Sequence, residues 1–347
     1  MTTYLTTRLT NDFNDDTNPQ VSNLGDVVWE SEFSFGDRDL GYYNGITEEV
    51  TTIANDFNDE TNPQISEFGD VVYEWEFSTG DSDIRFYDVL EDSTRFPAPI
   101  GIDQTNPQIS GNRVVYEHES TSSNTDIYLY NDFTRTNTPI AQTFFNEVNP
   151  QIAGNFVVYE REISNSNTDV YLYDDLTGIT IPISTTSRNE TNAQVSESGD
   201  VVYEFEFSST DSDIYIRDFF SGKISTLANT TNDEINPQIA GNYVTWQAWD
   251  GNDWEIYLHD QLTGEITALT DNTKDDIDPQ VSDLGYVVWE HEFSSSDTDI
   301  YLYDGSEIEF LADSFNDEVN PQISDNHVTW EAWDGNDWEI YTATIFE

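Results

Sequence analysis

Short stretches of alternating hydrophobic and polar residues, separated by turn signals, follow one another along the whole chain. In residues 236–270 the turn signals are Ala-Gly-Asn, Asp-Gly-Asn-Asp and Leu-Thr-Gly. They divide this segment into four expected strands, at residues 237–240, 243–249, 254–260 and 265–270. The third strand recurs elsewhere as Asp-Ile-Tyr-Leu-Tyr-Asp, with aliphatic side chains on one face and Tyr on the other. We therefore expect short antiparallel strands in sheets that are buried on both faces.

The tripeptide Asn-Pro-Gln, or a one-residue variant of it, recurs every 42 to 44 residues. We call its first residue the anchor. The eight anchors are Asn18, Asn62, Asn106, Asn149, Asn192, Asn236, Asp278 and Asn320. This period is typical of four-stranded propeller blades, and the long helical periodicity of two-helix repeats is not visible. A two-layer sandwich would leave polar outward faces. The sequence predicts one all-β domain over residues 1–347, an eight-bladed β-propeller of four-stranded antiparallel blades.

The two ends of the chain predict how the last blade is completed. The eighth repeat stops after its third expected strand, which ends in Glu-Ile-Tyr-Thr-Ala-Thr-Ile-Phe-Glu. Residues 4–10 resemble the fourth strand at residues 265–270. We expect residues 4–10 to be the closing strand of the last blade, which would remove a free sheet edge.

The repeat motifs resemble those of the TolB-like propellers, a family related to WD-repeat propellers. The resemblance covers essentially the whole chain and is carried by Asn236-Pro237-Gln238-Ile239, Tyr243-Val244-Thr245-Trp246, Glu255-Ile256-Tyr257-Leu258 and Leu262-Thr263-Gly264. It implies a propeller fold without a single activity, because such propellers include periplasmic scaffolds, peptidase domains and some polysaccharide lyases. It favours an extracellular or periplasmic location, although the first ten residues do not read as a signal peptide.

The charge of the chain restricts its partners. Lys and Arg number 11 and Asp and Glu 69, for a formal net charge of −58. We therefore expect neither nucleic-acid binding nor membrane insertion. Such a charge favours cations or basic partners instead. We expect a folded chain, because aromatic residues reach 14%. We also expect it to be a monomer. Cysteine is absent, so thiolate chemistry is excluded.

Two acidic series precede the anchors. The outer series, three positions before each anchor, contains Asp15, Asp59, Asp103, Asn146, Asn189, Asp233, Asp275 and Asp317. The inner series, two positions before each anchor, contains Asp16, Glu60, Gln104, Glu147, Glu190, Glu234, Asp276 and Glu318. If the first strand of each blade is innermost, the anchors outline the rim of a central channel and both series gather at its mouth. Such oxygen clusters suit calcium. Solvated charge or adaptation to salt is the alternative, with the anchors bonding backbone groups between blades.

A further series follows the aromatic residue of each second strand: Glu30, Glu74, Glu117, Glu160, Glu204, Gln247, Glu290 and Glu331. Two interpretations stay open for it. The side chains could lie at an edge near solvent and pair with backbone or Tyr hydroxyl groups, or they could act as acids and bases.

Repeats six and eight share the sequence Ala-Trp-Asp-Gly-Asn-Asp-Trp-Glu-Ile-Tyr. It should bring Trp249 near Trp254, and Trp333 near Trp338, across a hairpin. These pairs could stack on sugar rings or could simply stabilise the hairpin.

No nucleophile triad, zinc-binding helix motif or phosphate loop is found in the sequence. The sequence predicts a non-catalytic binding or scaffold propeller with an acidic loop face that binds calcium and presents a protein or glycan surface. The alternatives are a lyase-like enzyme domain, a substrate-gating propeller of a larger enzyme, and a structural spacer of a surface protein.

Overall fold

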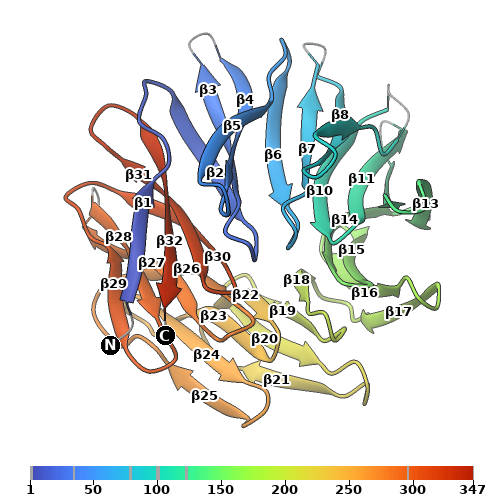
Figure 1. Ribbon diagram of the computed structural model, residues 1–347. Helices are drawn as coiled ribbons and strands as arrows, with labels where there is room; N and C mark the ends of the chain where they lie inside the picture. Colours follow the sequence, from blue (N-terminus) through green and yellow to red (C-terminus); the bar gives the residue numbers. More distant parts are fainter. Residues whose placement is uncertain are drawn as a thin grey trace. The chain divides into compact units, whose positions relative to one another are not determined.

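The computed structural model describes residues 3–33, 36–77, 80–98, 102–121, 124–294 and 297–346. Every regular element among these residues is a β-strand, and the strands form eight four-stranded antiparallel sheets (Figure 1). We call each sheet a blade and number the blades in chain order. Within the part of the chain that the structure describes, no helix has the length and apolarity needed to cross a membrane. The predicted fold class, an all-β chain of eight four-stranded antiparallel blades, is confirmed.

The chain divides into two compact units, and it passes from one to the other within β14 and β30. The first unit comprises residues 1–150 and 322–347. Its strands in blades 1 to 3 are β2 (Asp15–Val21), β3 (Val27–Phe33), β4 (Asp37–Asn44), β5 (Glu49–Ala54), β6 (Asp59–Ile65), β7 (Val71–Glu76), β8 (Ser82–Asp88), β9 (Ser93–Arg95), β10 (Gln104–Ser110), β11 (Arg113–Thr121), β12 (Asn124–Asn131) and β13 (Thr136–Ala141). Blade 8 consists of β30 (Glu318–Ser324), β31 (His327–Trp333), β32 (Trp338–Phe346) and β1 (Thr3–Arg8).

The second unit comprises residues 151–321. The strands of blades 4 to 7 are β14 (Asn146–Ala153), β15 (Phe156–Ser164), β16 (Asn167–Asp174), β17 (Ile179–Ser184), β18 (Glu190–Val195), β19 (Val201–Ser208), β20 (Asp211–Arg217), β21 (Ile224–Ala228), β22 (Glu234–Ala240), β23 (Tyr243–Trp249), β24 (Trp254–Asp260), β25 (Glu265–Ala268), β26 (Asp276–Val281), β27 (Val287–Ser294), β28 (Asp297–Tyr303) and β29 (Ile308–Ala312).

The N-terminal strand completes the last blade, as the sequence predicted. Strand β1 pairs antiparallel with β32, in a register that runs from Thr3 opposite Phe346 to Arg8 opposite Tyr341. The contact continues past the strand, where Leu9 N–H donates to the carbonyl of Ile340 at 2.8 Å. The Ile340 N–H in turn donates to Thr10 Oγ1 at 2.9 Å. Residues 3–10 therefore occupy the place that β25 and the residues after it occupy in blade 6.

Neighbouring blades within each unit pack their hydrophobic faces against each other. In the first unit, Val28 and Leu40 of blade 1 share a buried cluster with Val71 and Tyr73 of blade 2. In the second unit, Val202 and Ile214 of blade 5 pack in the same way against Val244 and Trp246 of blade 6. Full burial of each such aliphatic side chain contributes about 1.5–3 kcal/mol. The alternation of aliphatic and aromatic side chains in strands such as Asp-Ile-Tyr-Leu-Tyr-Asp is thus explained by sheets that are covered on both faces.

Each anchor has a left-handed backbone. All eight anchors have φ between 50° and 56°, a conformation that Asn and Asp tolerate better than most residues. In the blades whose pairing is described, the strand register shifts at the anchor, as between Thr17 and Gln20 or between Ile235 and Gln238. The anchor is therefore part of a β-bulge, which bends the strand and turns the backbone N–H of the anchor away from its own sheet.

Candidate functional site

The anchors connect each blade to the blade before it. The backbone N–H of Asn62 donates to the carboxylate of Glu30 in blade 1 at 2.7 Å, and its side chain donates to Glu74 of its own blade at 2.9 Å. The same backbone bond joins all eight anchors to the preceding second strand: Asn18 to Glu331, Asn62 to Glu30, Asn106 to Glu74, Asn149 to Glu117, Asn192 to Glu160, Asn236 to Glu204, Asp278 to Gln247 and Asn320 to Glu290. Both partners of every bond lie within one unit.

These contacts explain the glutamates of the second strands. Glu30 and Glu204 are buried, and burial raises the pKa of Glu204, while the bonds from Asn192 and Asn236 oppose that rise. Backbone partners were one of the two interpretations open from the sequence, and the anchor side chains are a second set of partners that it missed. A carboxylate that holds two blades together in this way is a structural group. The role of the anchors as a channel rim stays a prediction.

The outer acidic series caps the third strand of the preceding blade. Asp59 Oδ1 accepts the backbone N–H of Arg38 at 3.2 Å, and Asp275 Oδ1 accepts that of Trp254 at 3.0 Å. The other bonds of this kind run to Asp15 from Trp338, to Asp103 from Ser82, to Asn146 from Thr125 and to Asp233 from Ser212. These side chains therefore satisfy donors at strand beginnings, a use that Asp and Asn share.

The side chains of the inner acidic series are buried, and several of them accept hydrogen bonds from the loop that precedes them. Each member is the first or second residue of the first strand of its blade, so the series lies in the sheets and not in the loops. Glu234 accepts the backbone N–H and the hydroxyl of Thr230, four residues earlier. Glu147, Glu190 and Glu318 bind the Thr or Ser four residues earlier in the same way. Burial raises the pKa of Asp16 to about 7 and that of Glu60 to about 8.

Asp276 follows this pattern through Asn272, whose side-chain amide donates to it from four residues earlier, and it has further partners. It accepts bonds from Trp289 Nε1 and from His291 Nδ1, each at 2.8 Å. His291, in the second strand of blade 7, is buried against this carboxylate. Most members of the two acidic series make local contacts, although Asp16 Oδ2, Glu60 Oε2 and Glu190 Oε2 have no hydrogen-bond partner among the described residues. The calcium role predicted for both series stays a prediction.

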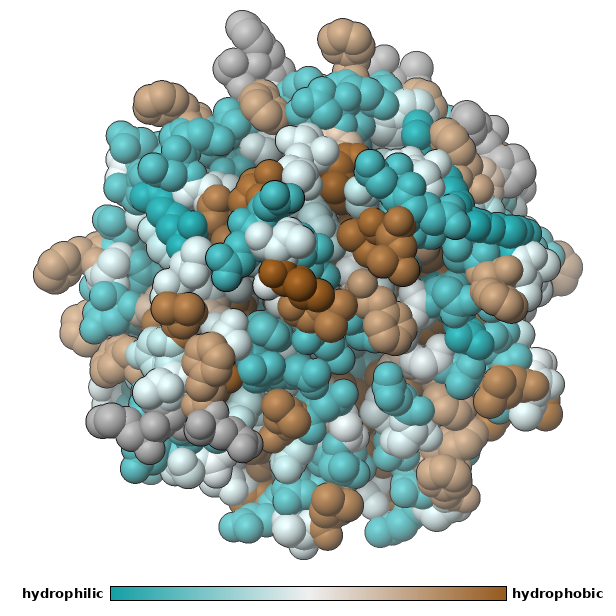
Figure 2. All heavy atoms as spheres, in the orientation of Figure 1, coloured by the Kyte–Doolittle hydropathy of each residue, from teal (hydrophilic) through white to brown (hydrophobic). Residues whose placement is uncertain are grey.

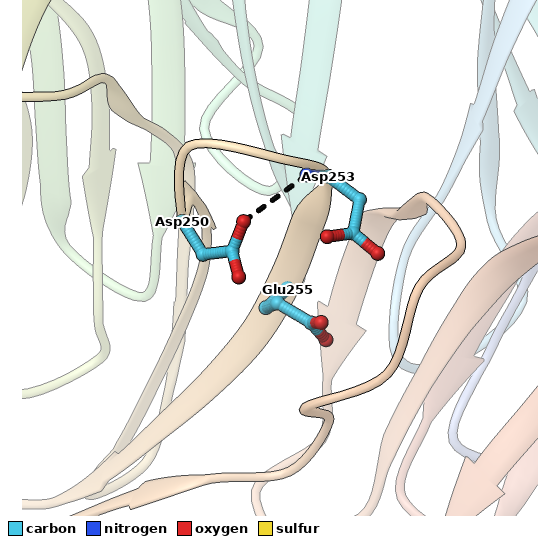
Figure 3. Close-up of side chains that lie close together, drawn as sticks. All are labelled: Asp250, Asp253 and Glu255. Atoms are coloured by element: carbon cyan, nitrogen blue, oxygen red, sulfur yellow. Dashed lines mark hydrogen bonds between the residues drawn. The ribbon is translucent and has the colours of Figure 1, made fainter.

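Among the residues that the structure describes, there are two other clusters of three carboxylates, and each cluster is compact enough to hold a metal ion. They are Asp250, Asp253 and Glu255 in blade 6, and Asp334, Asp337 and Glu339 in blade 8. Both belong to the shared ten-residue sequence, in the turn between the second and third strands. Figure 3 shows Asp250 and Asp253 at the two ends of this turn in blade 6, with Glu255 on the strand that follows. Asp250 Oδ1 accepts the backbone N–H of Asn252 and of Asp253, which holds the pKa of Asp250 below its usual range.

The tryptophan pairs lie where the sequence placed them. Trp249 is opposite Trp254, and Trp333 is opposite Trp338. The ring centroids are 5.6 Å and 5.5 Å apart, and the rings meet edge to face. Such packing stabilises a hairpin by about 0.5–1.5 kcal/mol. All four rings are partly exposed, so each pair also leaves aromatic surface for a ligand.

A pocket of about 340 Å³ opens beside Trp249, within the second unit. Its walls combine aromatic and aliphatic side chains with amide, hydroxyl and carboxylate groups: Leu227, Ala228, Asn229, Thr230, Asn232, Glu234, Trp246, Ala248, Trp249, Asp250, Tyr257 and Ile266. The size and the mixture of groups are typical of small-ligand sites. The sequence pointed to Trp249 but not to this pocket, because Leu227 and Ala228 of its wall belong to β21 of blade 5 whereas Trp249 belongs to blade 6.

Large hydrophobic side chains are exposed at equivalent loop positions. Phe13, Phe57 and Phe144 of the first unit, which are 95%, 100% and 102% exposed, stand three residues before the inner acidic series, as does Phe315 in the second unit. Figure 2 shows hydrophobic side chains among hydrophilic ones on the face drawn, some standing singly and others in small groups. The repeated Phe was visible in the sequence, and its spacing from the anchors could have identified these loop tips.

Comparison with known proteins supports the fold. No family model and no curated protein matches the chain. Solved structures do: the β-propeller domain of the Trilobed protease from Pyrococcus furiosus is 15% identical, with a TM-score of 0.61, over 89% of this chain and 98% of that domain. An oligogalacturonate lyase solved with manganese is 11% identical, with a TM-score of 0.62, over 100% of this chain and 97% of the lyase.

A prolyl endopeptidase is 11% identical to the chain, with a TM-score of 0.67. The match covers 93% of this chain but 55% of the endopeptidase, so the chain spans about half the length of that enzyme. At such identities the likeness shows the fold alone. Together with the eight four-stranded sheets, it makes this chain a β-propeller. The narrower resemblance to TolB-like propellers stays a prediction.

Proposed function

We propose that the chain is a non-catalytic binding propeller, and that the pocket beside Trp249 takes a neutral oligosaccharide. The observation that carries this proposal is the pocket itself, about 340 Å³ in volume and lined by Trp246, Trp249 and Tyr257 together with polar groups. Sugar rings combine apolar faces with hydroxyl groups at their edges, so they suit a pocket that offers aromatic surface beside hydrogen-bonding side chains.

The charge of the chain favours a neutral ligand over an acidic one. A net charge of −58 repels uronates, and the two acidic residues of the pocket, Glu234 and Asp250, would add to the repulsion. Carboxylates are hydrogen-bond acceptors, so they suit the hydroxyl groups of a neutral sugar.

The local hydrogen bonds of the same two carboxylates argue against catalysis, although the pKa values of the two groups are shifted in opposite directions. Burial raises the pKa of Glu234, and hydrogen bonds lower that of Asp250, a difference that glycosidases use for an acid and a nucleophile. However, Glu234 binds Thr230 as Glu147 and Glu318 bind their own loops. Asp250 is committed to its turn in the same way as Asp334 of blade 8, which accepts the backbone N–H of Asn336. Residues repeated in several blades for local structure are a weak basis for one specialised reaction.

Titration calorimetry with neutral oligosaccharides tests the proposal. Trp249→Ala should weaken binding about tenfold or more, because it removes the ring that borders the pocket. Trp333→Ala is the matched control, since it changes the same residue of the same ten-residue sequence in the other unit. Thermal melts of both variants report the folding. Equal loss in both variants, or no binding by the unaltered chain, would contradict the sugar site, and the release of shortened or unsaturated sugars would contradict the non-catalytic role.

The exposed loop phenylalanines favour a second candidate, which is protein binding. Phe13 and Phe57 stand in the sequence Asn-Asp-Phe-Asn-Asp, so apolar tips are flanked by carboxylates. Exposed aromatic side chains at repeated positions are a common feature of interaction surfaces. A basic partner with aromatic or aliphatic side chains fits this chemistry. Peptide display against the intact chain should enrich such sequences, and replacing Phe13, Phe57 and Phe144 by Ser should abolish the enrichment if these tips form the surface.

A further inference from the structure

We propose that Asp250, Asp253 and Glu255 form a calcium site in blade 6, and that Arg8 supplies the positive charge at the equivalent place in blade 8. The two places share ten identical residues and differ in what neutralises their carboxylates. The inference concerns metal binding and is tested without sugar, so it does not depend on the proposed function.

The spacing of the oxygens fits calcium. One oxygen from each of the three side chains lies within 4.8 Å of the others. Calcium binds oxygen at 2.3–2.6 Å, so two of its ligands can stand up to about 5 Å apart. Magnesium binds at 2.0–2.1 Å and allows about 4 Å, and it prefers to keep its waters. Oxygens within this distance of one another are close enough together for one calcium ion to reach all three.

Two of the three carboxylates are buried and incompletely satisfied. Asp253 is 3% exposed and Glu255 is 2% exposed. Among the residues that the structure describes, Asp253 Oδ2 and Glu255 Oε2 have no hydrogen-bond partner. Their other oxygens are used, because Asp253 Oδ1 accepts from Asn252 and Glu255 Oε1 accepts the backbone N–H of Asn272 at 2.7 Å. Burying an ionised carboxylate with an empty oxygen is costly unless a cation approaches it.

In blade 8, Arg8 is a cation that approaches the equivalent carboxylates. Arg8 Nη2 lies 2.9 Å from Asp334 and 2.6 Å from Glu339, the residues that correspond to Asp250 and Glu255. The guanidinium thus binds both the exposed carboxylate of Asp334 and the buried carboxylate of Glu339. Arg8 belongs to β1, the strand that completes blade 8, and pairs with Tyr341.

In blade 6 the residue at the place of Arg8 is Ala268. It pairs with Tyr257, which corresponds to Tyr341, and it is exposed. Within the described part of the chain, no ion pair involves Asp250, Asp253 or Glu255. The same acidic cluster therefore stands once with an arginine beside it and once without one. Asp337 Oδ1 and Glu339 Oε2 of blade 8 also lack a hydrogen-bond partner among the described residues, so the two clusters differ in the nearby cation and not in their empty oxygens.

The experiment measures calcium by titration calorimetry, and terbium by luminescence that Trp249 and Trp254 would sensitise. An ionic strength of about 0.15 M suppresses diffuse binding to the acidic surface. Ala268→Arg copies the arrangement of blade 8 and changes an exposed residue, and Asp253→Asn removes a ligand oxygen. Arg8→Ala makes blade 8 resemble blade 6.

We expect one saturable calcium site in the unaltered chain. Ala268→Arg and Asp253→Asn should each weaken it roughly tenfold or more, while Arg8→Ala should add a second site. Thermal melts with calcium should show stabilisation by mass action that Ala268→Arg loses. If calcium binds equally to the unaltered chain and to a folded Ala268→Arg variant, or if the unaltered chain shows no saturable site, the proposal is wrong.

Discussion

An Asn anchor such as Asn62 combines a left-handed backbone with hydrogen-bond donors that point to two different blades. In Asn62, φ is 50°, the backbone N–H binds Glu30 and the side chain binds Glu74. Asn is suited to both tasks, because it tolerates a positive φ and carries an amide that can donate. At position 278 Asp keeps the backbone conformation and the backbone bond, there to Gln247.

This pairing predicts a difference between two substitutions of Glu74. Glu74→Ala removes the acceptor of Asn62 and Asn106 and should lower the free energy of unfolding by about 2–4 kcal/mol. Glu74→Gln keeps one acceptor oxygen, as Gln247 does in blade 6, and should cost less than about 1 kcal/mol. Urea denaturation measures both. Equal losses in the two variants would contradict the role given to the acceptor.

Part of this residue-level picture could be predicted from sequence. The repeated Asn before Pro and the repeated Glu after an aromatic residue were both visible as series in the sequence. Their pairing was not, because Glu30 and Asn62 belong to different blades, and only the packing of blades brings them together. Arg8 and Asp334, which are also in contact, are further apart still along the sequence, since 326 positions separate them.

At the scale of elements, β1 contributes through its backbone more than through its side chains. Most of its side chains are exposed, but all six residues are paired with β32, and Arg8 also binds two carboxylates of blade 8. Without β1, strand β32 would become an unpaired edge.

Deletion of residues 1–10 should therefore lower the melting temperature by several degrees, on the scale of about 2–4 °C per kcal/mol for large domains. The lost contacts are the β1 ladder, the ion pairs of Arg8 and the bond from Ile340 to Thr10. Differential scanning calorimetry measures the change, with a chain lacking only residues 1 and 2 as control. An unchanged melting temperature would show that the closing strand does not contribute to stability.

The strands themselves were predictable because alternation and turn signals agree in every repeat. The expected second and third strands of blade 6, at 243–249 and 254–260, coincide with β23 and β24. The first strand begins earlier than expected, at Glu234, because a buried carboxylate bound to its own loop does not look like a strand residue in a hydrophobic pattern. The pocket beside Trp249 was missed for a related reason, since it needs two blades.

For the whole molecule, the 69 acidic residues make stability depend on pH. Burial raises the pKa of Glu60 to about 8 and that of Asp16 to about 7, above their ordinary values of 4.5 and 3.8. The contribution of such groups to the free energy of unfolding is fully present at low pH, where they are protonated in both the folded and the unfolded chain. As the pH rises, the unfolded chain loses these protons first, and the stability that they contribute is lost up to the folded pKa.

We therefore expect the free energy of unfolding to fall between about pH 5 and pH 8. Glu60→Gln should make this decline less steep and raise stability at pH 8 by about 1–2 kcal/mol, because Gln104 already occupies the same position in blade 3. Glu49→Gln, at an exposed position of β5, is the control with the same change in charge. Urea denaturation across this pH range measures both, and parallel curves for the two variants would contradict the effect of burial.

The bond between each anchor and the preceding glutamate also bears on how such a chain can change over generations. Every repeat carries one acceptor for its successor and one donor for its predecessor, at the same two positions. A gene that gains or loses one whole repeat keeps a matched donor and acceptor at every junction. Duplication of a repeat can thus lengthen this protein, and deletion of one can shorten it, without new compensating mutations at the junction.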